Sequence, residues 1–324
     1  MRGLAGVPGA TRAEHSDCWL LPMTSRELLA QGPDSLAGTS SKNCARATAR
    51  LERSLKAIRL YWWQGEGEHD PGRRNFGDYL SPLIVGMLSR RPVEYAPVET
   101  ADMLAIGTIL KRERKARRFL LPRRLHIWGS GAGDPEERFA GRHYYHAVRG
   151  RHTLAGIEWP TARAGQSVVA LGDPGLLVAH YWSGRRRPAK SYALGVIPHF
   201  VDQDTATVKA LLQIRGARLI NVFAPIDEVL REVASCVGVV SSSLHGLIVS
   251  DALNVPNRRL LISGNIRSSL KFADYYSAFA LDEPIPIEGA SVRGSERPED
   301  LIGEYLHRDV ESVCAGLVRS FPHL

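Results

Sequence analysis

The chain has 324 residues, of which 44% are hydrophobic and 23% charged, and its formal net charge is +8 at pH 7. These values are ordinary for a folded protein of one large or two medium domains. No apolar run approaches the roughly 20 residues that would span a bilayer, which argues against a transmembrane protein.

The cysteines and the N-terminus bear on the compartment. The N-terminus has no apolar core typical of a secretory signal. Four cysteines are scattered without the spacing of a metal site: Cys18, Cys44, Cys236 and Cys314. We therefore expect free thiols and a cytoplasmic protein.

Two basic clusters contribute to the positive charge. Lys111–Arg124 holds eight basic residues and one glutamate, and Arg185–Arg187 is a smaller cluster. Such clusters favour an anionic partner, either nucleic acid, an acidic membrane surface or a phosphorylated substrate, although a solvated face is the alternative. Neither cluster is interleaved with aromatic residues, so we expect no nucleic-acid binding.

Residues 1–55 differ in composition from the rest of the chain. They are rich in Gly, Ala, Ser, Thr and Arg and show little hydrophobic periodicity. This predicts a poorly ordered leader, with Ser25–Gln31 compatible with a short helix.

Residues 56–182 alternate between predicted strands and helices. Asp78 is predicted to cap a helix that runs through Leu80–Leu88. Short apolar runs, each followed by a turn with glycine, predict strands at Ile58–Trp63, Met103–Ile106, Leu125–Trp128, Tyr144–Val148 and Val168–Leu171.

A second alternation occupies residues 191–324. The polar, basic stretch Tyr181–Lys190 separates the two, and we predict the linker at 183–190. Strands are predicted at Tyr192–Ile197, Arg218–Val222, Val237–Val240 and Leu260–Ile262. Helices are predicted at Thr205–Ile214, Ile226–Ser235, Leu247–Leu253 and Pro298–Leu317, the last closing the chain. The pattern indicates two consecutive open α/β domains with a ligand in the cleft at the carboxyl ends of the strands.

The junction in Cys236–Pro256 is the strongest candidate site. A short apolar strand meets Ser241–Ser243, then His245-Gly246, then a helical pattern. A helix N-terminus of this kind suits an anion, and His245 could move a proton beside it. The alternative is that the serines only cap the helix.

Other polar motifs also follow predicted strands. They are Asn75-Phe76-Gly77-Asp78, Gly129-Ser130-Gly131, Val148-Arg149-Gly150-Arg151, Gly172-Asp173-Pro174 and Ile197-Pro198-His199. Arginine suits bidentate capture of a carboxylate or phosphate. If the strand continued through Arg149 and Arg151, only one would face the cleft, and we favour Arg149.

Several cofactor sites are not indicated. Gly129-Ser130-Gly131 is not a complete dinucleotide-binding fingerprint, which argues against a nicotinamide cofactor. There is no P-loop and no His-Glu-x-x-His motif. His143 and His146 lack acidic or Cys neighbours at ligand spacing, so no metal is expected.

Taken together, the motifs resemble the polysaccharide pyruvyl transferase family. They are NFGDYL (75–80), AIGTIL (105–110), WGSG (128–131), VRGRHT (148–153), LGDPGLL (171–177), GVIPHFVD (195–202), SSSLHGLIVSDALNVP (241–256) and KFADYY (271–276). The resemblance covers about residues 57–280. It implies two Rossmann-like domains in a glycosyltransferase-B-like arrangement. It also implies transfer of a pyruvyl group from phosphoenolpyruvate to a sugar of a surface polysaccharide, as a cyclic ketal, with no other cofactor.

On this reading each motif has an expected task. His245 is the first choice for acid/base catalysis, with His199 in reserve and Asp78 orienting a hydroxyl or the donor. The expected donor contacts are Arg149, Arg151, Ser242, Ser243, Gly246 and Lys271, and the expected acceptor or cleft residues are Asn75, Gly77, Gly129 and Ser130. Peripheral contact with an anionic membrane is expected for Lys111–Arg124.

Two other functions fit the same architecture. One is a nucleotide-sugar glycosyltransferase, although no segment for a base and ribose is evident. The other is a non-catalytic protein that binds polysaccharide intermediates. The three functions differ in which ligand stabilises the protein against heat: phosphoenolpyruvate, a nucleotide sugar or a free oligosaccharide.

Overall fold

The computed structural model describes residues 56–65, 74–118, 121–160, 168–262, 269–303 and 305–324. These residues fall in one compact unit. The predicted leader (1–55), with Ser25–Gln31, Cys18 and Cys44, lies outside the described residues.

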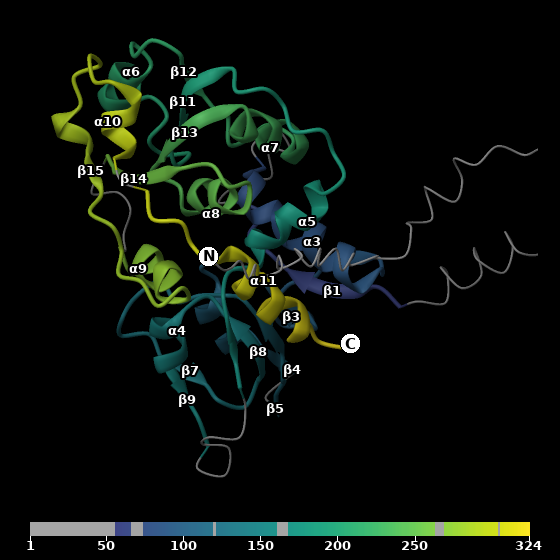
Figure 1. Ribbon diagram of the computed structural model, residues 1–324. Coiled ribbons are helices and arrows are strands. Elements are labelled where there is room, and N and C mark those ends of the chain that lie inside the picture. Colours follow the sequence, from purple (N-terminus) through teal and green to yellow (C-terminus); the bar gives the residue numbers. More distant parts are fainter. Residues whose placement is uncertain (1–55, 66–73, 119–120, 161–167, 263–268, 304) are drawn as a thin grey trace, which may run out of the picture. The chain divides into compact units, whose positions relative to one another are not determined.

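A six-stranded parallel sheet forms the first half of the described chain, and Figure 1 labels its strands β1, β3 and β8. The strand order is β10-β8-β6-β3-β1-β2. Its strands are β1 (Ile58–Tyr61), β2 (Val93–Tyr95), β3 (Met103–Leu104), β6 (His126–Trp128), β8 (Tyr144–Val148) and β10 (Ala170–Leu171). The five strands predicted here are confirmed, four of them shorter than predicted. Because the strands are parallel, their carboxyl ends lie along one edge.

Helices and two small sheets accompany the first sheet. The helices are α3 (Phe76–Ser89), η2 (Leu110–Lys115), α4 (Arg151–Ala155), η4 (Pro174–Leu177) and α5 (Val178–Trp182). The small sheets pair β4 (Arg117–Arg118) with β5 (Leu121–Pro122) and β7 (Phe139–Ala140) with β9 (Ile157–Glu158).

A five-stranded parallel sheet forms the second half, in the order β12-β11-β13-β14-β15. Its strands are β11 (Tyr192–Ile197), β12 (Ala217–Leu219), β13 (Cys236–Ser241), β14 (Asn257–Leu261) and β15 (Ile287–Glu288). The accompanying helices are α6 (Ala206–Leu211), α7 (Ile226–Ala234), α8 (Leu244–Ala252), α9 (Leu270–Ser277), η5 (Gly289–Ser291), α10 (Pro298–Ile302) and α11 (Val310–Arg319). Two parallel sheets with helices confirm the α/β class, while the division into domains at 183–190 stays a prediction.

The prediction of one closing helix over Pro298–Leu317 is wrong. Gly303 has a φ of 61°, which ends α10, and the side chain of Asp309 starts α11 by accepting the Ser312 N–H at 3.0 Å. The two helices also pack differently. α10 contacts β13 and β14, whereas α11 contacts β10, and Trp128 donates to the carbonyl of Leu317 at 3.0 Å.

The cap of α3 also differs from the prediction. Asn75 is the N-cap residue, and its side chain accepts the Gly77 N–H at 2.9 Å. Asp78 lies in the first turn instead, where a carboxylate is favoured by the helix dipole.

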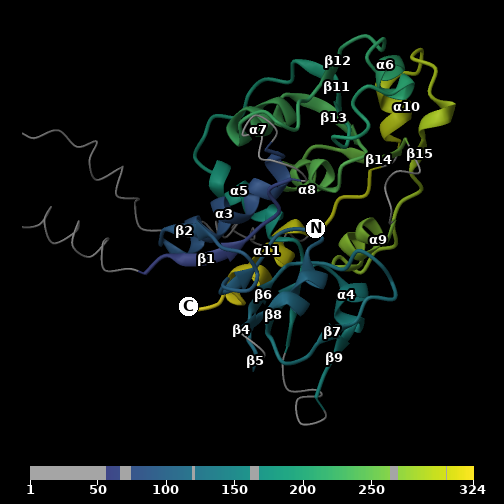
Figure 2. The same ribbon diagram turned by 180° about the vertical axis from the view of Figure 1, so that it is seen from behind.

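One hydrophobic cluster joins the two sheets. It includes Phe76 and Leu80 of α3, Trp128 of β6, and Leu247 and Ile248 of α8, all nearly or fully buried. The helices α3, α5 and α8 lie together where the two halves meet (Figure 2).

Two further properties of the described residues concern thiols and membranes. Cys236 and Cys314 are buried free thiols, as predicted. Within the described ranges, every helix is too short or too polar to cross a membrane.

Candidate active site

Two helix N-termini, one from each half of the chain, meet at the carboxyl ends of the strands. A Cβ atom placed on Gly77 in α3 would lie 2.2 Å from Nδ1 of His245 in α8. Next to this contact, the Phe76 N–H donates to the carbonyl of Val222 at 2.9 Å. Only glycine allows the imidazole this close to the backbone of α3, so Gly77 and His245 are direct neighbours.

The three serines build the junction before α8. Ser241 accepts the Ser243 N–H at 3.0 Å, and Ser242 accepts the His199 N–H at 2.8 Å while donating to Asp202 at 2.9 Å. All three serines are buried. The Ser242 hydroxyl, predicted as a donor contact, therefore positions His199.

Capping of α8 by serine, the alternative explanation of this motif, is also not what the structure shows. Ser243 occupies the N-cap position, but its side chain makes no capping hydrogen bond. A Cβ on Gly246 would lie 2.3 Å from the Ser241 hydroxyl, so this glycine lets the helix pack on the serine turn.

His245 is a neutral imidazole, and one of its ring nitrogens has no hydrogen-bond partner among the described residues. Burial, together with the nearby positive charges of Lys271 and Arg149, lowers its pKa to about 3. Its Nε2 atom is buried and has no hydrogen-bond partner among the described residues. Such a nitrogen can accept a proton, or hold one when an anion binds beside it.

Asp78 and Lys271 form a second titrating pair. Burial raises the pKa of Asp78 to about 7, with Lys271 acting in the opposite direction. Burial lowers the pKa of Lys271 to about 8, helped by Arg149 and Arg259 and opposed by Asp78. Near neutral pH, Lys271 therefore carries a charge and Asp78 exchanges a proton easily.

His199 completes the group. Burial lowers its pKa to about 4, assisted by Lys271 and opposed by Asp202. The electrostatic influence of Lys271 thus reaches Asp78, His199 and His245. The structure brings these predicted residues together, although they come from distant parts of the sequence.

Arg149 is held in a buried network. Its guanidinium is fully buried and donates to Asp274 at 2.9 Å, to Thr108 at 2.7 Å and to the carbonyl of Ala132 at 2.5 Å. Asp274 also accepts from the backbone and hydroxyl of Thr153, at 2.9 and 2.6 Å. Arg149 is thus a fixed charge at the site, committed to the fold.

Arg149 was favoured over Arg151 on the condition that one strand continues through both residues, and the structure does not meet this condition. β8 ends at Val148, and Arg151 is the first residue of α4, so the strand does not continue through them. Arg151 is exposed, and its Nε donates to the carbonyl of Ser277 at 3.1 Å.

The Gly129-Ser130-Gly131 turn is filled by the protein itself. A Cβ on Gly129 would lie 2.0 Å from Pro174, and one on Gly131 would lie 2.2 Å from Cζ of Arg149. Ser130 is fully buried and donates to the carbonyl of Ala105. The turn has a packing role, which argues against the predicted acceptor contacts of Gly129 and Ser130.

Two buried carboxylates lie in the predicted motifs but had no predicted role. Asp274, inside KFADYY, pairs with Arg149. Asp173, inside GDPGLL, accepts the Gly175 N–H at 2.9 Å through one oxygen, while the other is buried with no partner among the described residues. Burial raises the pKa of Asp173 to about 6. The motifs KFADYY and GDPGLL were the signal in the sequence that could have pointed to these two carboxylates. Nothing in the sequence shows that Asp274 or Asp173 lies near Arg149.

The contact between Gly77 and His245 gives a testable prediction. Gly77→Ala would force the imidazole away, because 2.2 Å is far inside van der Waals contact, and turnover should fall at least about tenfold. Gly86→Ala in the same helix is the control, since its Cβ would meet nothing closer than 3.6 Å. Phosphate release from phosphoenolpyruvate, the donor that the family resemblance implies, measures both variants, and equal activity of the two would contradict a positioning role for Gly77.

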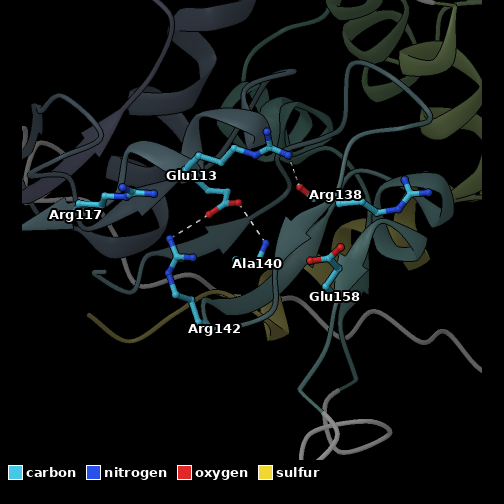
Figure 3. Close-up of a pocket in the computed structure, with 7 residues that line it drawn as sticks. Glu113, Arg117, Arg138, Ala140, Arg142 and Glu158 are labelled. Atoms are coloured by element: carbon cyan, nitrogen blue, oxygen red, sulfur yellow. Dashed lines mark hydrogen bonds and ion pairs between the residues drawn. The ribbon is translucent and has the colours of Figure 1, made fainter. Parts of the chain in front are cut away.

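A separate pocket lies in the basic region (Figure 3). It has a volume of about 280 Å³ and is lined by Glu113, Arg114, Arg117, Arg138, Ala140, Arg142 and Glu158. Glu113 is buried and accepts from His143 at 2.6 Å and from the Ala140 N–H at 3.2 Å. None of the predicted site residues lines this pocket.

The histidines weighed as metal ligands have other partners. His143 bonds Glu113, and the facing nitrogens of His126 and His146 are 2.9 Å apart. No group of three or more potential His, Cys, Asp or Glu ligands occurs within the described part of the chain.

Comparisons with known proteins agree with the motifs. A family model described as polysaccharide pyruvyl transferase matches residues 114–261. The uncharacterized protein L143 of Acanthamoeba polyphaga mimivirus is 32% identical over 143 residues, which are 42% of this chain and 48% of L143. The succinoglycan biosynthesis protein ExoV of Rhizobium meliloti (strain 1021) is 28% identical over 230 residues, 67% of this chain and 64% of ExoV.

The chain covers less than two thirds of the length of either relative. No solved structure matches the chain significantly. The segment matched by the family model contains Arg149, His199 and His245, whereas Asp78 and Lys271 lie outside it. Residues 114–261 match the model of the polysaccharide pyruvyl transferase family, the family that the motifs of the sequence resemble.

Proposed function

We propose that this protein transfers a pyruvyl group from phosphoenolpyruvate to two hydroxyls of a sugar in a polysaccharide repeat unit, forming a cyclic ketal. The observation that carries the proposal is the convergence of Asp78, His199, His245 and Lys271 beside the fixed charge of Arg149. The family match and the similarity to a succinoglycan biosynthesis protein support the polysaccharide acceptor.

The charges of the site suit this donor. Phosphoenolpyruvate presents a phosphate and a carboxylate, and it needs cations in a partly desolvated place. Lys271 supplies an ammonium, and the N-terminus of α8 (Leu244–Ala252) favours an anion at its first turn. Arg149 adds long-range attraction, although Asp274 offsets much of its charge.

The reaction has two stages. First, a sugar hydroxyl adds to C2 of the donor while a proton is delivered to its methylene carbon, which becomes a methyl group. Second, the bond from C2 to the phosphate oxygen breaks, and the neighbouring hydroxyl attacks C2 and loses its proton. The products are the ketal and inorganic phosphate, without a further cofactor.

His245 and Asp78 can divide the proton transfers. Environments that push two pKa values apart separate an acid from a base, and here the values are about 3 for His245 and about 7 for Asp78. In the free protein His245 is neutral, and it becomes a better base for the hydroxyl proton when a bound anion raises its pKa. A bound trianion raises the pKa of both groups, so that either proton could arrive with the donor.

The proposal includes an arrangement of the chain. We infer that the two sheets belong to Rossmann-like domains in a glycosyltransferase-B-like arrangement, with the donor in a cleft where α3 and α8 approach each other. This is supported by the parallel order of both sheets and the contact between Gly77 and His245.

Ligand-dependent stability and product release test the function together. Phosphoenolpyruvate should raise the melting temperature, whereas nucleotide sugars should not. With an acceptor oligosaccharide, phosphate should be released, and the glycan should gain the mass of one pyruvate ketal per repeat. Stabilisation by a nucleotide sugar alone would favour a glycosyltransferase. Stabilisation by an oligosaccharide alone, without phosphate release, would favour a binding protein.

We also infer that the basic stretch Lys111–Arg124 holds the enzyme at the anionic inner face of the cytoplasmic membrane, near a lipid-linked acceptor. Exposed side chains in this stretch include Lys111, Arg114, Lys115 and Arg117. Arg114 and Arg117 line the pocket of Figure 3, where phosphate groups would meet several guanidiniums. Each basic residue near such a surface contributes about 1 kcal/mol at most.

Sedimentation with vesicles tests this inference. Replacing Lys111, Arg114, Lys115 and Arg117 with glutamine should greatly reduce sedimentation with vesicles that contain phosphatidylglycerol and leave phosphoenolpyruvate binding unchanged. The charge-matched control replaces four exposed residues of the second half: Arg186, Arg187, Lys209 and Arg215. Equal sedimentation of the two variants would indicate that Lys111–Arg124 is only a solvated face and does not bind the membrane.

A further inference from the structure

Aromatic side chains gather at the carboxyl ends of β1 and β2, at one end of the first sheet. We call the following five residues the aromatic cluster: Tyr61, Trp62, Trp63, Tyr79 and Tyr95. Because both strands are parallel to β8, the cluster lies on the same sheet edge as Arg149. Ligands of open α/β sheets bind at this edge.

Trp62 is at the centre of the cluster. The ring centroids of Trp62 and Tyr95 are 5.1 Å apart with planes at 85°, and those of Trp62 and Tyr79 are 6.0 Å apart at 73°. Tyr61 lies 6.0 Å from Tyr95. Edge-to-face contacts of this kind fix the ring planes. The Trp62 indole nitrogen is buried and has no partner among the described residues.

Part of the cluster is open to solvent. Tyr61 and Trp62 are buried, but Trp63 and Tyr79 are half-buried and Tyr95 is 43% exposed.

Charged groups surround the rings. Arg112 lies over Trp63 with Cζ 4.4 Å from the ring centroid, and Arg74 lies over Tyr79 at 5.4 Å. Both Arg112 and Glu99 affect the pKa of Tyr95, which burial raises, so its hydroxyl stays protonated at neutral pH. Flat apolar faces with hydroxyl, guanidinium and carboxylate groups at the rim match a sugar ring, which has an apolar C–H face and polar edges.

The cluster is continuous with the candidate active site. Tyr79 follows Asp78 directly in α3, and Asp78 contributes to the raised pKa of Tyr61, although burial is the main cause. A sugar stacked on the cluster would therefore have a neighbouring carboxyl able to meet its hydroxyls.

We propose that the aromatic cluster binds a sugar ring of the acceptor, with Trp63 and Tyr95 as the stacking surfaces. This inference rests on the proposed function for the identity of the ligand as an acceptor. The tyrosine hydroxyls supply hydrogen bonds to the sugar. The cluster replaces the Gly129-Ser130 turn as the acceptor contact.

A pair of tyrosines of similar exposure provides the test. Tyr95 is 43% exposed at the carboxyl end of β2, and Tyr144 is 40% exposed at the amino end of β8 in the same sheet. Tyr95→Ala, alone and combined with Trp63→Ala, should weaken sugar binding about tenfold or more, as loss of an aromatic anchor does. Tyr144→Ala should leave it unchanged. The probes are glucose, galactose, lactose and cellobiose, titrated calorimetrically without donor.

Measurements of phosphoenolpyruvate binding distinguish a failure of this inference from a failure of the proposed function. Thermal stabilisation by phosphoenolpyruvate should be the same in wild type, Tyr95→Ala and Tyr144→Ala. Loss of sugar binding in Tyr95→Ala supports the acceptor site even if no phosphate is ever released, in which case the proposed function fails alone. Equal sugar affinity of Tyr95→Ala and Tyr144→Ala, or no sugar binding by the wild type, overturns the acceptor site and leaves the donor chemistry untouched.

Discussion

Replacing His245 with alanine should lower turnover about 10²–10⁴-fold, the usual effect of losing acid/base assistance. The open Nε2 atom beside Lys271 is the group lost. The turn before α8 is held by Ser241 and Ser242, not by the imidazole, so the fold should survive. Affinity for phosphoenolpyruvate should change much less, because Lys271 and the helix N-terminus remain. Phosphate release at saturating donor and acceptor measures the effect.

Variants of two other histidines serve as a control and as a test of the alternative catalytic residue. His152→Ala removes an exposed imidazole in α4 and should leave turnover unchanged. His199→Ala tests the reserve candidate, whose backbone N–H is fixed by Ser242. If His199→Ala lost turnover while His245→Ala kept it, the roles assigned to the two histidines would be reversed. If neither mattered in a protein that releases phosphate, acid/base catalysis at this junction would be excluded.

The pH profile of kcat/KM tests whether Lys271 keeps its role in donor capture when His245 is replaced. With a pKa of about 3, His245 is neutral at every pH well above that value. Its loss should therefore not shift the limbs of the pH profile. Lys271 is charged below a pKa of about 8, so donor capture should weaken as the pH rises through that value. His245→Ala should retain this alkaline limb at much lower activity.

The sequence predicted those parts of the molecule that local patterns determine. Tyr144–Val148 and Tyr192–Ile197 are strands with the predicted bounds. Each is a short, mainly apolar run of residues, which fits a strand of a parallel sheet. His245, His199 and Asp78 were predicted because polar residues after strands gather at one sheet edge. Residues at the carboxyl ends of parallel strands share that edge whichever strands are neighbours.

Contacts between distant segments could not be predicted in this way. Arg149 and Asp274 are 125 positions apart, and only the folded chain shows that they pair. The packing of Pro174 on Gly129 and of the imidazole on Gly77 likewise depends on tertiary contacts. The sequence therefore indicated which motifs matter but assigned Arg149 and Ser242 to ligand binding, where the structure uses their polar groups internally.

Replacing Arg149 with alanine should consequently destabilise the protein by about 3–5 kcal/mol, the range for breaking a buried ion pair from one side. Asp274 would keep its bonds to Thr153 but lose its only charged partner among the described residues, in a place without solvent exposure. Chemical denaturation measures this loss. Weakened donor binding should follow mainly from the smaller folded population and the lost long-range charge.

A double-mutant cycle separates the ion pair from donor capture. Asp274→Asn combined with Arg149→Met removes both charges and keeps much of the volume, so the double variant should be more stable than the sum of the single effects predicts. If Arg149→Ala instead folded with unchanged stability and lost only phosphoenolpyruvate affinity, the guanidinium would be a direct donor contact. A large coupling energy with Asp274, together with donor binding restored in the double variant, would establish that Arg149 serves the site by holding α9 (Leu270–Ser277), and with it Lys271, in place.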